Sequence, residues 1–245
     1  MTHALCCTPP RCSDPALAAR LAIEENPANG APAGTGGRKK RAVGITRNFW
    51  APGRTLRIRF LEGTPLELQQ AVFNKGSTWL QYANLKFELV EPGAEAEITI
   101  EMKPAGTGIN YSWPGTEALL PEAMPTMVLS VTPEDERFEL TVLHEFGHLL
   151  GALHEHQHPD AEIPWDAESL YEMYEDMGRK HVHEQFLDKY PRSDVYNTVY
   201  DKNSIMHYDI PEEWALDGWS LKRDNRSITE KDKTFMRTVY PPADS

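Results

Sequence analysis

Five residues between positions 144 and 154 have the types and the spacing of a metal site: His144, Glu145, His148, Gly151 and His154. Together they spell H-E-x-x-H-x-x-G-x-x-H. Residues four apart lie on one face of an α-helix, about 5–6 Å from each other, so His144 and His148 can turn their imidazole nitrogens toward one metal ion. Gly151 lets the chain leave the helix in a conformation that other residues resist, so that His154 can return as a third ligand.

Three imidazole ligands indicate a catalytic zinc site, because they leave one coordination position open for water or substrate. Glu145 stands beside the first ligand, where its carboxylate can reach a metal-bound water and act as general base. We therefore expect one Zn²⁺ per chain, held by His144, His148 and His154. An accidental cluster of histidines is the alternative, and the fixed spacing of the glycine and of the third histidine argues against it.

A second motif, Ser204-Ile205-Met206-His207-Tyr208, follows downstream. A long histidine motif followed by a Met-turn is the signature of metzincins. At this point the chain resembles the astacin-like branch of the metzincin zinc endopeptidases, whose Met-turn reads S-x-M-H-Y, and Glu155 after the third histidine agrees with that branch. The resemblance implies that Tyr208 is an additional, displaceable zinc ligand that hydrogen-bonds the oxyanion during turnover. Met206 would form an apolar, adaptable floor beneath the metal.

The resemblance also implies an α+β, zincin-like fold. Its upper subdomain would hold a twisted mixed β-sheet and the zinc helix, and its lower subdomain would be mainly helical or irregular. The alternation over 56–60 predicts a half-buried strand, and 85–90 and 96–102 predict two more. Glycines and prolines in 103–125 predict a long loop. By resemblance, 126–131 is the edge strand that pairs with an extended substrate.

Capping signals predict where the helices begin. Thr64-Pro65-Leu66-Glu67 has the form of a capping box, and Thr132-Pro133-Glu134-Asp135 is expected to cap the zinc helix. Later helices are expected to begin near Asp166 and at Ser227-Ile228-Thr229-Glu230. The histidines at 156 and 158 could support a ligand or contact a substrate loop, but a solvated turn is the simpler interpretation.

The chain is acidic, with 25 Lys and Arg against 37 Asp and Glu and a net charge of −12. Residues 1–41 carry six basic and three acidic side chains, which leaves −15 on the remainder. An acidic body disfavours a nucleic-acid partner, and no stretch approaches the roughly 18 apolar residues of a membrane span. We expect protein or peptide substrates and a monomer. The compartment stays unknown: the resemblance favours an extracellular protein, but no signal-peptide pattern is visible.

Two parts are expected along the chain: residues 1–41 as a flexible N-terminal segment and possible propeptide, and residues 42–245 as the zinc metallopeptidase catalytic domain. Asn26 to Gly37 is rich in Gly, Ala and Pro, which is typical of a flexible linker. The run Arg38-Lys39-Lys40-Arg41 is a candidate cut site for a processing protease, with a solvated charge run as the alternative. By resemblance, cleavage would free the amine of Ala42.

Astacins bury the mature N-terminal amine against the glutamate that follows the third histidine. The resemblance therefore pairs the Ala42 amine with Glu155.

All three cysteines, Cys6, Cys7 and Cys12, lie among the first dozen residues, so the catalytic domain has no disulfide. This departs from the bridged domains of animal astacins. Pro10-Arg11-Cys12 is similar to the segment with which matrixin propeptides cap their zinc through a thiolate, and Cys12 is therefore a candidate latency switch. Free surface thiols are one alternative, and an adventitious metal site formed by His3 and the three cysteines is the other.

The function that the sequence predicts is that of a zinc-dependent metalloendopeptidase. A zinc-activated water would attack the scissile carbonyl, Glu145 would take its proton, and Tyr208 would stabilise the oxyanion. The alternative is a catalytically silent zinc-binding interaction module on a metzincin scaffold. Glu145 argues against this alternative, because a binding-only protein needs no base at that position. The substrate and its cleavage-site preference cannot be read from the sequence.

Overall fold

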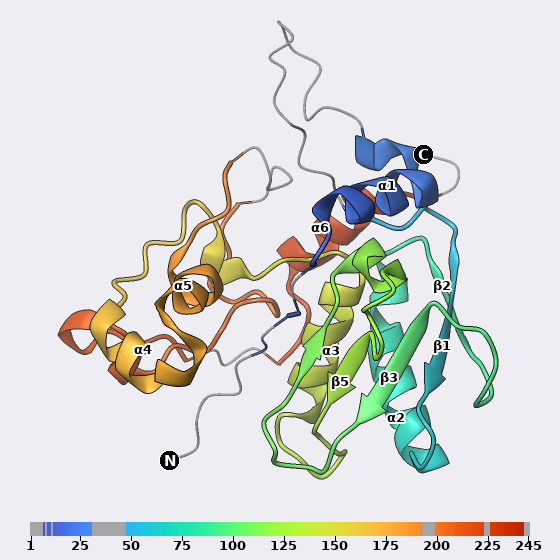
Figure 1. The fold of residues 1–245 in the computed structure, drawn as a ribbon, viewed down its shortest axis with the longest axis horizontal. Coiled ribbons are helices and arrows are strands. Elements are labelled where there is room, and N and C mark those ends of the chain that lie inside the picture. The colour runs from blue at the N-terminus through green and yellow to red at the C-terminus, as the bar shows by residue number, and fades with distance from the viewer. Residues whose placement is uncertain are drawn as a thin grey trace, which may run out of the picture.

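The computed structural model describes residues 7, 9–10, 12–30, 48–192, 199–222 and 226–242. The five strands are β1 (Thr55–Phe60), β2 (Lys86–Leu89), β3 (Ile98–Met102), β4 (Tyr111–Ser112) and β5 (Met127–Leu129). The α-helices of the described residues are α1 (Pro15–Glu25), α2 (Leu66–Gly76), α3 (Phe138–Leu149), α4 (Ala167–Met173), α5 (Arg179–Val182) and α6 (Glu230–Val239). The sheet with α2 and α3 forms one lobe, and α4 and α5 lie in the other (Figure 1).

One mixed sheet, in the order β2-β1-β3-β5-β4, organises the larger lobe. Its strands pair in parallel except β4, which runs antiparallel to β5. The predicted alternation of β1 is confirmed, because Leu56, Ile58 and Phe60 are buried while the residues between them are partly exposed. The mixed sheet and its helices confirm the α+β class, and β1, with its period of two, is an interior strand of that sheet.

The edge strand is not the one that we expected. β5, within 126–131, lies between β3 and β4, so its two edges are already paired. The free edge near the zinc helix belongs to β4, which comprises only two residues inside the stretch predicted as a long loop. Two residues are too few to produce a visible alternation, which is why the sequence concealed this strand.

Two predicted helix caps also differ. Thr64 does not cap α2, because its hydroxyl donates to the carbonyl of Leu61 at 3.0 Å, and the helix begins at Leu66. Residues 132–135 form a turn in which Asp135 accepts from the backbone of Thr132, and α3 starts three residues later. The expected starts of α4, capped by the side chain of Asp166, and of α6, capped by Thr229, are confirmed.

Two apolar clusters correspond to the two lobes. The larger one packs the sheet against α2, α3 and α6, and Gly76 of α2 lies so close to α3 that an added Cβ would meet the ring of Phe146 at 2.3 Å. The smaller cluster includes Leu170, Val182, Phe186 and Trp214, all from the second lobe. No helix in the described part of the chain is both long and apolar enough to cross a membrane.

The N-terminal segment is only partly as expected. α1 and the 3₁₀ turn Pro27–Gly30 are regular structure, and Asn26 and Asn29 are buried, so the first residues of the predicted flexible linker are packed against the domain. The error arises because the Ala- and Pro-rich composition also suits a short helix capped by Asp14. The described residues that precede α1 run between the two lobes (Figure 1). Positions 31–47, with the polybasic run and Ala42, lie outside the described residues.

Candidate metal centre and active site

The helix that carries the metal motif, α3, is buried along its length except at Glu139. The last carbonyl groups of a helix have no partner within it, and here side chains from distant segments supply donors. The Trp50 indole donates to Leu149 O at 2.9 Å, and the Tyr240 hydroxyl donates to Leu150 O at 2.9 Å. These bonds fix the end of α3, from which the chain turns toward the third histidine.

Gly151 makes that turn as predicted. Its φ is +85°, and a Cβ there would meet the Phe49 ring at 2.8 Å, so both the backbone conformation and the close packing favour glycine. The chain then carries His154 back beside α3. The three Nε2 atoms lie 3.2 Å apart between His144 and His148, 3.0 Å between His148 and His154, and 3.3 Å between His144 and His154.

This triangle has the size that a zinc ion requires. Three nitrogens at 2.0–2.1 Å from a tetrahedral metal are about 3.3 Å from one another. The second ring nitrogen of each helical histidine is occupied, because Nδ1 of His144 faces Ile205 O and Nδ1 of His148 faces Ala152 O, each at 2.8 Å. A carbonyl only accepts, so Nδ1 carries the proton and Nε2 keeps its lone pair for a metal.

Burial also keeps the rings of His148 and His154 neutral. Desolvation lowers the pKa of His148 to about 4, and desolvation together with the neighbouring histidines holds the pKa of His154 well below its ordinary value. Neutral imidazole is the form that binds metal. The three predicted ligands are thus brought together in a state that fits zinc.

The Met-turn closes the site from below. Ser204 donates to Asp232 of α6 at 2.6 Å, and the same carboxylate accepts from the backbone of Ile205 at 3.0 Å. The Met206 sulfur lies against α3 between the two helical histidines, where a Cβ on Gly147 would approach it to 2.3 Å. The predicted apolar floor is therefore packed against the backbone of the zinc helix itself.

Glu145 is almost completely buried beside the cluster, and burial raises its pKa to about 8. Its partner is a residue that we did not predict there: the Cys7 thiol donates to Glu145 Oε2 at 3.2 Å. The Cys7 sulfur and one ring nitrogen of each of the three histidines lie within 4.8 Å of one another. The Tyr208 hydroxyl donates to the backbone carbonyl of the same cysteine.

The structure thus places Cys7, and not the predicted Cys12, beside the three histidines. Cys12 is half-buried against the larger core, near Glu117 and Glu122, and burial raises its thiol pKa. Two residues later Asp14 caps α1, which ties this part of the segment to the sheet lobe, and Cys7 upstream reaches the histidines. The Pro-Arg-Cys pattern indicated the segment but not the residue, and Cys7 was named only in the alternative of a metal site formed by His3 and the three cysteines.

The two histidines after the third ligand also differ from expectation. The predicted solvated turn is buried, with His156 1% and His158 3% exposed. His156 stacks on the ring of Tyr208, with centroids 4.1 Å apart and planes at 25°. An H-x-H pattern in a polar stretch carries no burial signal, which explains the error.

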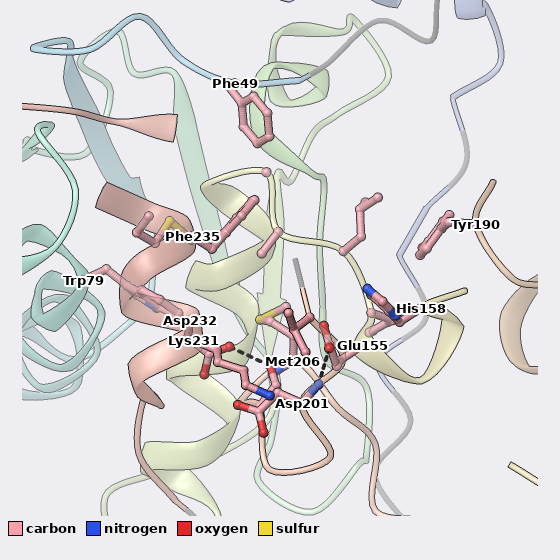
Figure 2. A pocket seen from close by; sticks show the side chains of 17 residues that line it. Phe49, Trp79, Glu155, His158, Tyr190, Asp201, Met206, Lys231, Asp232 and Phe235 are labelled. Carbon is pink, nitrogen blue, oxygen red and sulfur yellow. Dashed lines mark hydrogen bonds between the residues drawn. The ribbon is translucent and has the colours of Figure 1, made fainter. Parts of the chain in front are cut away.

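Glu155 faces a cavity of about 100 Å³ that is also lined by Ser204 and Met206 of the Met-turn. Its carboxylate accepts from the backbone of Asp201 at 2.7 Å, and burial raises its pKa to about 8. Figure 2 shows Glu155, Asp201 and Asp232 at one end of the cavity and Phe49 at the other. The predicted partner amine, that of Ala42, lies outside the described residues.

Comparison with known proteins agrees with this geometry. The model of the peptidase family described as Astacin matches residues 119–219. Zinc metalloproteinase nas-38 of Caenorhabditis elegans is 24% identical over 184 residues, which cover 71% of this chain and 22% of nas-38. The chain thus spans less than a quarter of that relative.

Solved structures extend the likeness. A structure of myroilysin is 34% identical with a TM-score of 0.69, covering 80% of this chain and 96% of that one. A crystal structure of myroilysin is 32% identical with a TM-score of 0.62, over 80% and 86% of the two chains. High choriolytic enzyme 1, a hatching enzyme zinc-protease of the medaka Oryzias latipes, is 16% identical with a TM-score of 0.55 over 79% and 94%, which is a likeness of fold alone.

The mixed sheet, the zinc helix and the three converging imidazoles define the class of protein as a metzincin-type zinc metallopeptidase. Within that class, the chain belongs to the astacin family of peptidases. The predicted family and fold are therefore confirmed.

Proposed function

We propose that this protein is a zinc-dependent endopeptidase that hydrolyses peptide bonds and is made in a latent form. The convergence of three imidazoles beside the buried carboxylate of Glu145 carries the proposal. His144, His148 and His154 would hold one zinc ion. Zinc bound there supplies Lewis acidity.

Glu145 is the general base. Its carboxylate accepts a proton from the attacking water and then donates that proton to the leaving amine. The position supports this role, because Glu145 and His144 line a small cavity of about 30 Å³ together with Tyr208 and Asn110. Asn110 directly precedes the edge strand β4, whose free backbone groups can pair with an extended peptide. The substrate is therefore a protein or peptide segment in extended form.

Tyr208 stabilises the oxyanion. Its ring lies 4.5 Å from that of His154 and 6.3 Å from that of His144. Its hydroxyl donates to a peptide carbonyl, that of Cys7, so it has the reach and the direction to serve a carbonyl at this centre. A donor aimed at developing negative charge stabilises a transition state more than a ground state.

Latency comes from the N-terminal segment through Cys7. A thiolate is a strong zinc ligand, and the Cys7 sulfur lies with the three ring nitrogens and against the general base. The segment would thereby exclude the attacking water, and it engages the base and the oxyanion donor through hydrogen bonds. Cleavage within the stretch before Asn48 would allow it to leave.

The alternative origin of latency is the absence of a charged amine at Glu155. The Glu155 cavity contains carboxylates and has an apolar wall, which suits a buried amine. Until the chain is cut, the Ala42 nitrogen belongs to a peptide bond and carries no charge, so it cannot form an ion pair with Glu155. In this alternative, cleavage activates the enzyme but Cys7→Ser in the uncut protein does not.

The test uses the processed protein and an internally quenched peptide. A chelator should abolish cleavage and added zinc should restore it. Glu145→Gln should keep one zinc per chain yet lower kcat by several orders of magnitude, because the base is lost while the ligands stay. Retention of most activity by Glu145→Gln, at full zinc content, would remove Glu145 from the mechanism.

A further inference from the structure

The ring of His156 lies against the phenol of Tyr208. The two rings stack with centroids 4.1 Å apart and an interplanar angle of 25°. Both side chains are buried, 1% and 4% exposed. The phenol also lies 4.5 Å from the ring of His154. His154 and His156 therefore both contact the tyrosine to which we assign stabilisation of the oxyanion.

A single turn of π-helix, His183–Leu187, holds His156 in place. The Nε2 atom of His156 lies 2.9 Å from the carbonyl oxygen of Gln185. A carbonyl only accepts, so Nε2 is the donor. Breaking this bond would leave a buried carbonyl unsatisfied, which makes tilting of the ring costly.

The same turn also reaches Tyr208. Phe186, next to Gln185, packs edge-on against the phenol at 6.2 Å and 62°. Gln157, next to His156, donates to Glu184 O at 2.9 Å and to Asp188 O at 3.0 Å. The segment after the third histidine is thus tied to the π-turn by two hydrogen bonds and to the residue that follows the turn by a third, and π-turns are frequent at functional sites.

The Met-turn fixes the backbone of Tyr208 but not its side-chain torsions. Rotation about the Cα–Cβ bond would carry the hydroxyl away from the carbonyl that it must reach. A ring stacked on the phenol, itself held by a hydrogen bond, removes that freedom before substrate arrives.

We propose that His156, clamped by the Gln185 carbonyl, sets the orientation of the Tyr208 phenol and is a positioning residue for peptide hydrolysis. The inference rests on the proposed role of Tyr208 in catalysis. It assigns to His156 an effect on kcat that acts through Tyr208 alone.

Kinetics of the processed protein test that route. His156→Ala should lower kcat about tenfold, leave KM within twofold and keep one zinc per chain. In the Tyr208→Phe background the same substitution should change kcat less than twofold, because the hydroxyl to be positioned is gone. His183→Ala, on the same π-turn but with its ring on Tyr171, is the matched control and should keep the parent kcat.

Two conservative variants separate stacking from hydrogen bonding and cover the case in which His156→Ala does not fold. His156→Phe keeps a ring and loses the donor, whereas His156→Gln keeps a donor and loses the ring. Stacking predicts a higher kcat for His156→Phe than for His156→Gln. The reverse order would overturn the proposal.

A readout without turnover completes the test. The chain has nine tyrosines, and in 3-fluorotyrosine-labelled full-length protein the ¹⁹F resonance of Tyr208 is the one missing from Tyr208→Phe. That resonance should shift and broaden in His156→Ala and stay unchanged in His183→Ala. An unchanged resonance, or equal losses of kcat in both tyrosine backgrounds, would refute the positioning role. If Tyr208→Phe alone keeps full kcat, the proposed oxyanion role fails instead, whatever the resonance does.

Discussion

Gly147 lies between the two helical histidines, and its missing side chain is a structural requirement. A Cβ there would stand 2.3 Å from the Met206 sulfur and 3.3 Å from Trp79 Cζ2. Glycine inside a helix costs about 1 kcal/mol relative to alanine. The helix accepts that cost because the Met-turn packs directly on its backbone, and Ile205 of the same turn holds His144.

We therefore expect Gly147→Ala to lower the free energy of unfolding by about 1–3 kcal/mol, in spite of the better helix propensity of alanine. Displacement of the Met-turn should also weaken zinc binding, because the Ile205 carbonyl that orients His144 moves with it. Urea unfolding with and without zinc measures both effects. Met206→Ala in the same chain should recover part of the loss by making room. A Gly147→Ala protein as stable as its parent would contradict this account of the contact.

Glu117 offers a pH test away from the metal. Burial raises its pKa from 4.5 to about 7, although Asn48 donates to its carboxylate at 2.7 Å. The folded protein then binds more protons than the unfolded one between these two values, so this group makes stability fall as pH rises from 4.5 to 7.

Glu117→Gln keeps an acceptor for Asn48 and removes the titration. The variant should be more stable than the parent by about 3 kcal/mol above pH 7, and the gain should vanish below pH 4.5. Chemical unfolding at several pH values gives the difference directly. A difference that is the same at every pH would show that Glu117 titrates normally.

Among the elements, α1 is attached to the domain by two asparagines. The Asn29 amide donates to Phe49 O at 2.8 Å and accepts from Phe49 N at 3.2 Å, so it pairs with both backbone groups of one residue. The Asn26 amide donates to Trp50 O at 3.0 Å. Phe49 also lines the Glu155 cavity (Figure 2), so the docked segment and that cavity share a wall.

Asn29→Ala should therefore loosen α1. It leaves the polar groups of Phe49 without this partner, a loss of about 1–3 kcal/mol for buried groups. Amide hydrogen exchange along α1 should become at least tenfold faster. Ser13→Ala, which removes an exposed bond to Glu122, is the control and should leave that exchange unchanged. Equal exchange in both variants would mean that α1 is held by apolar packing alone.

The parts of the site that follow a local period could be predicted from the sequence. His144, His148 and Glu145 follow from helical spacing, His154 from the glycine that ends the helix, and Met206 from its motif. The strand β1 and the start of α4 could be predicted from the sequence in the same way, since each depends on a few adjacent residues.

What the sequence concealed depends on packing between distant segments. Cys7 reaches the histidines because α1 packs on the sheet lobe and so directs the preceding residues toward the metal site. No local pattern in the first dozen residues predicts that course of the chain. β4 becomes an edge strand only through its partner β5. His156 is buried because a π-turn near residue 185 supplies its acceptor. Such long-range contacts leave no trace in spacing or alternation.

At the scale of the whole molecule, the N-terminal segment is held at two separate places. Cys7 lies at the metal centre between the lobes, and α1 lies on the sheet lobe against the 3₁₀ turn Gly115–Leu119. A cut within 31–47 severs the chain but neither contact. Release should therefore follow cleavage as a second step, so activity should appear with a lag after the cut. Dilution, which disfavours rebinding of the released segment, should raise the final activity.

The last prediction separates the two restraints in the full-length protein. Cys7→Ser should raise its basal rate of peptide cleavage at least tenfold, because a hydroxyl is a much weaker zinc ligand than a thiolate, while Cys12→Ser should leave that rate unchanged. Alkylation supplies a readout without turnover: in zinc-loaded protein Cys12 should react before Cys7, and a chelator should speed the reaction of Cys7 selectively. Should processing activate the enzyme while Cys7→Ser does not, the restraint lies in the withheld Ala42 amine. Equal rates for the parent, both serine variants and the processed protein would show that the segment restrains nothing.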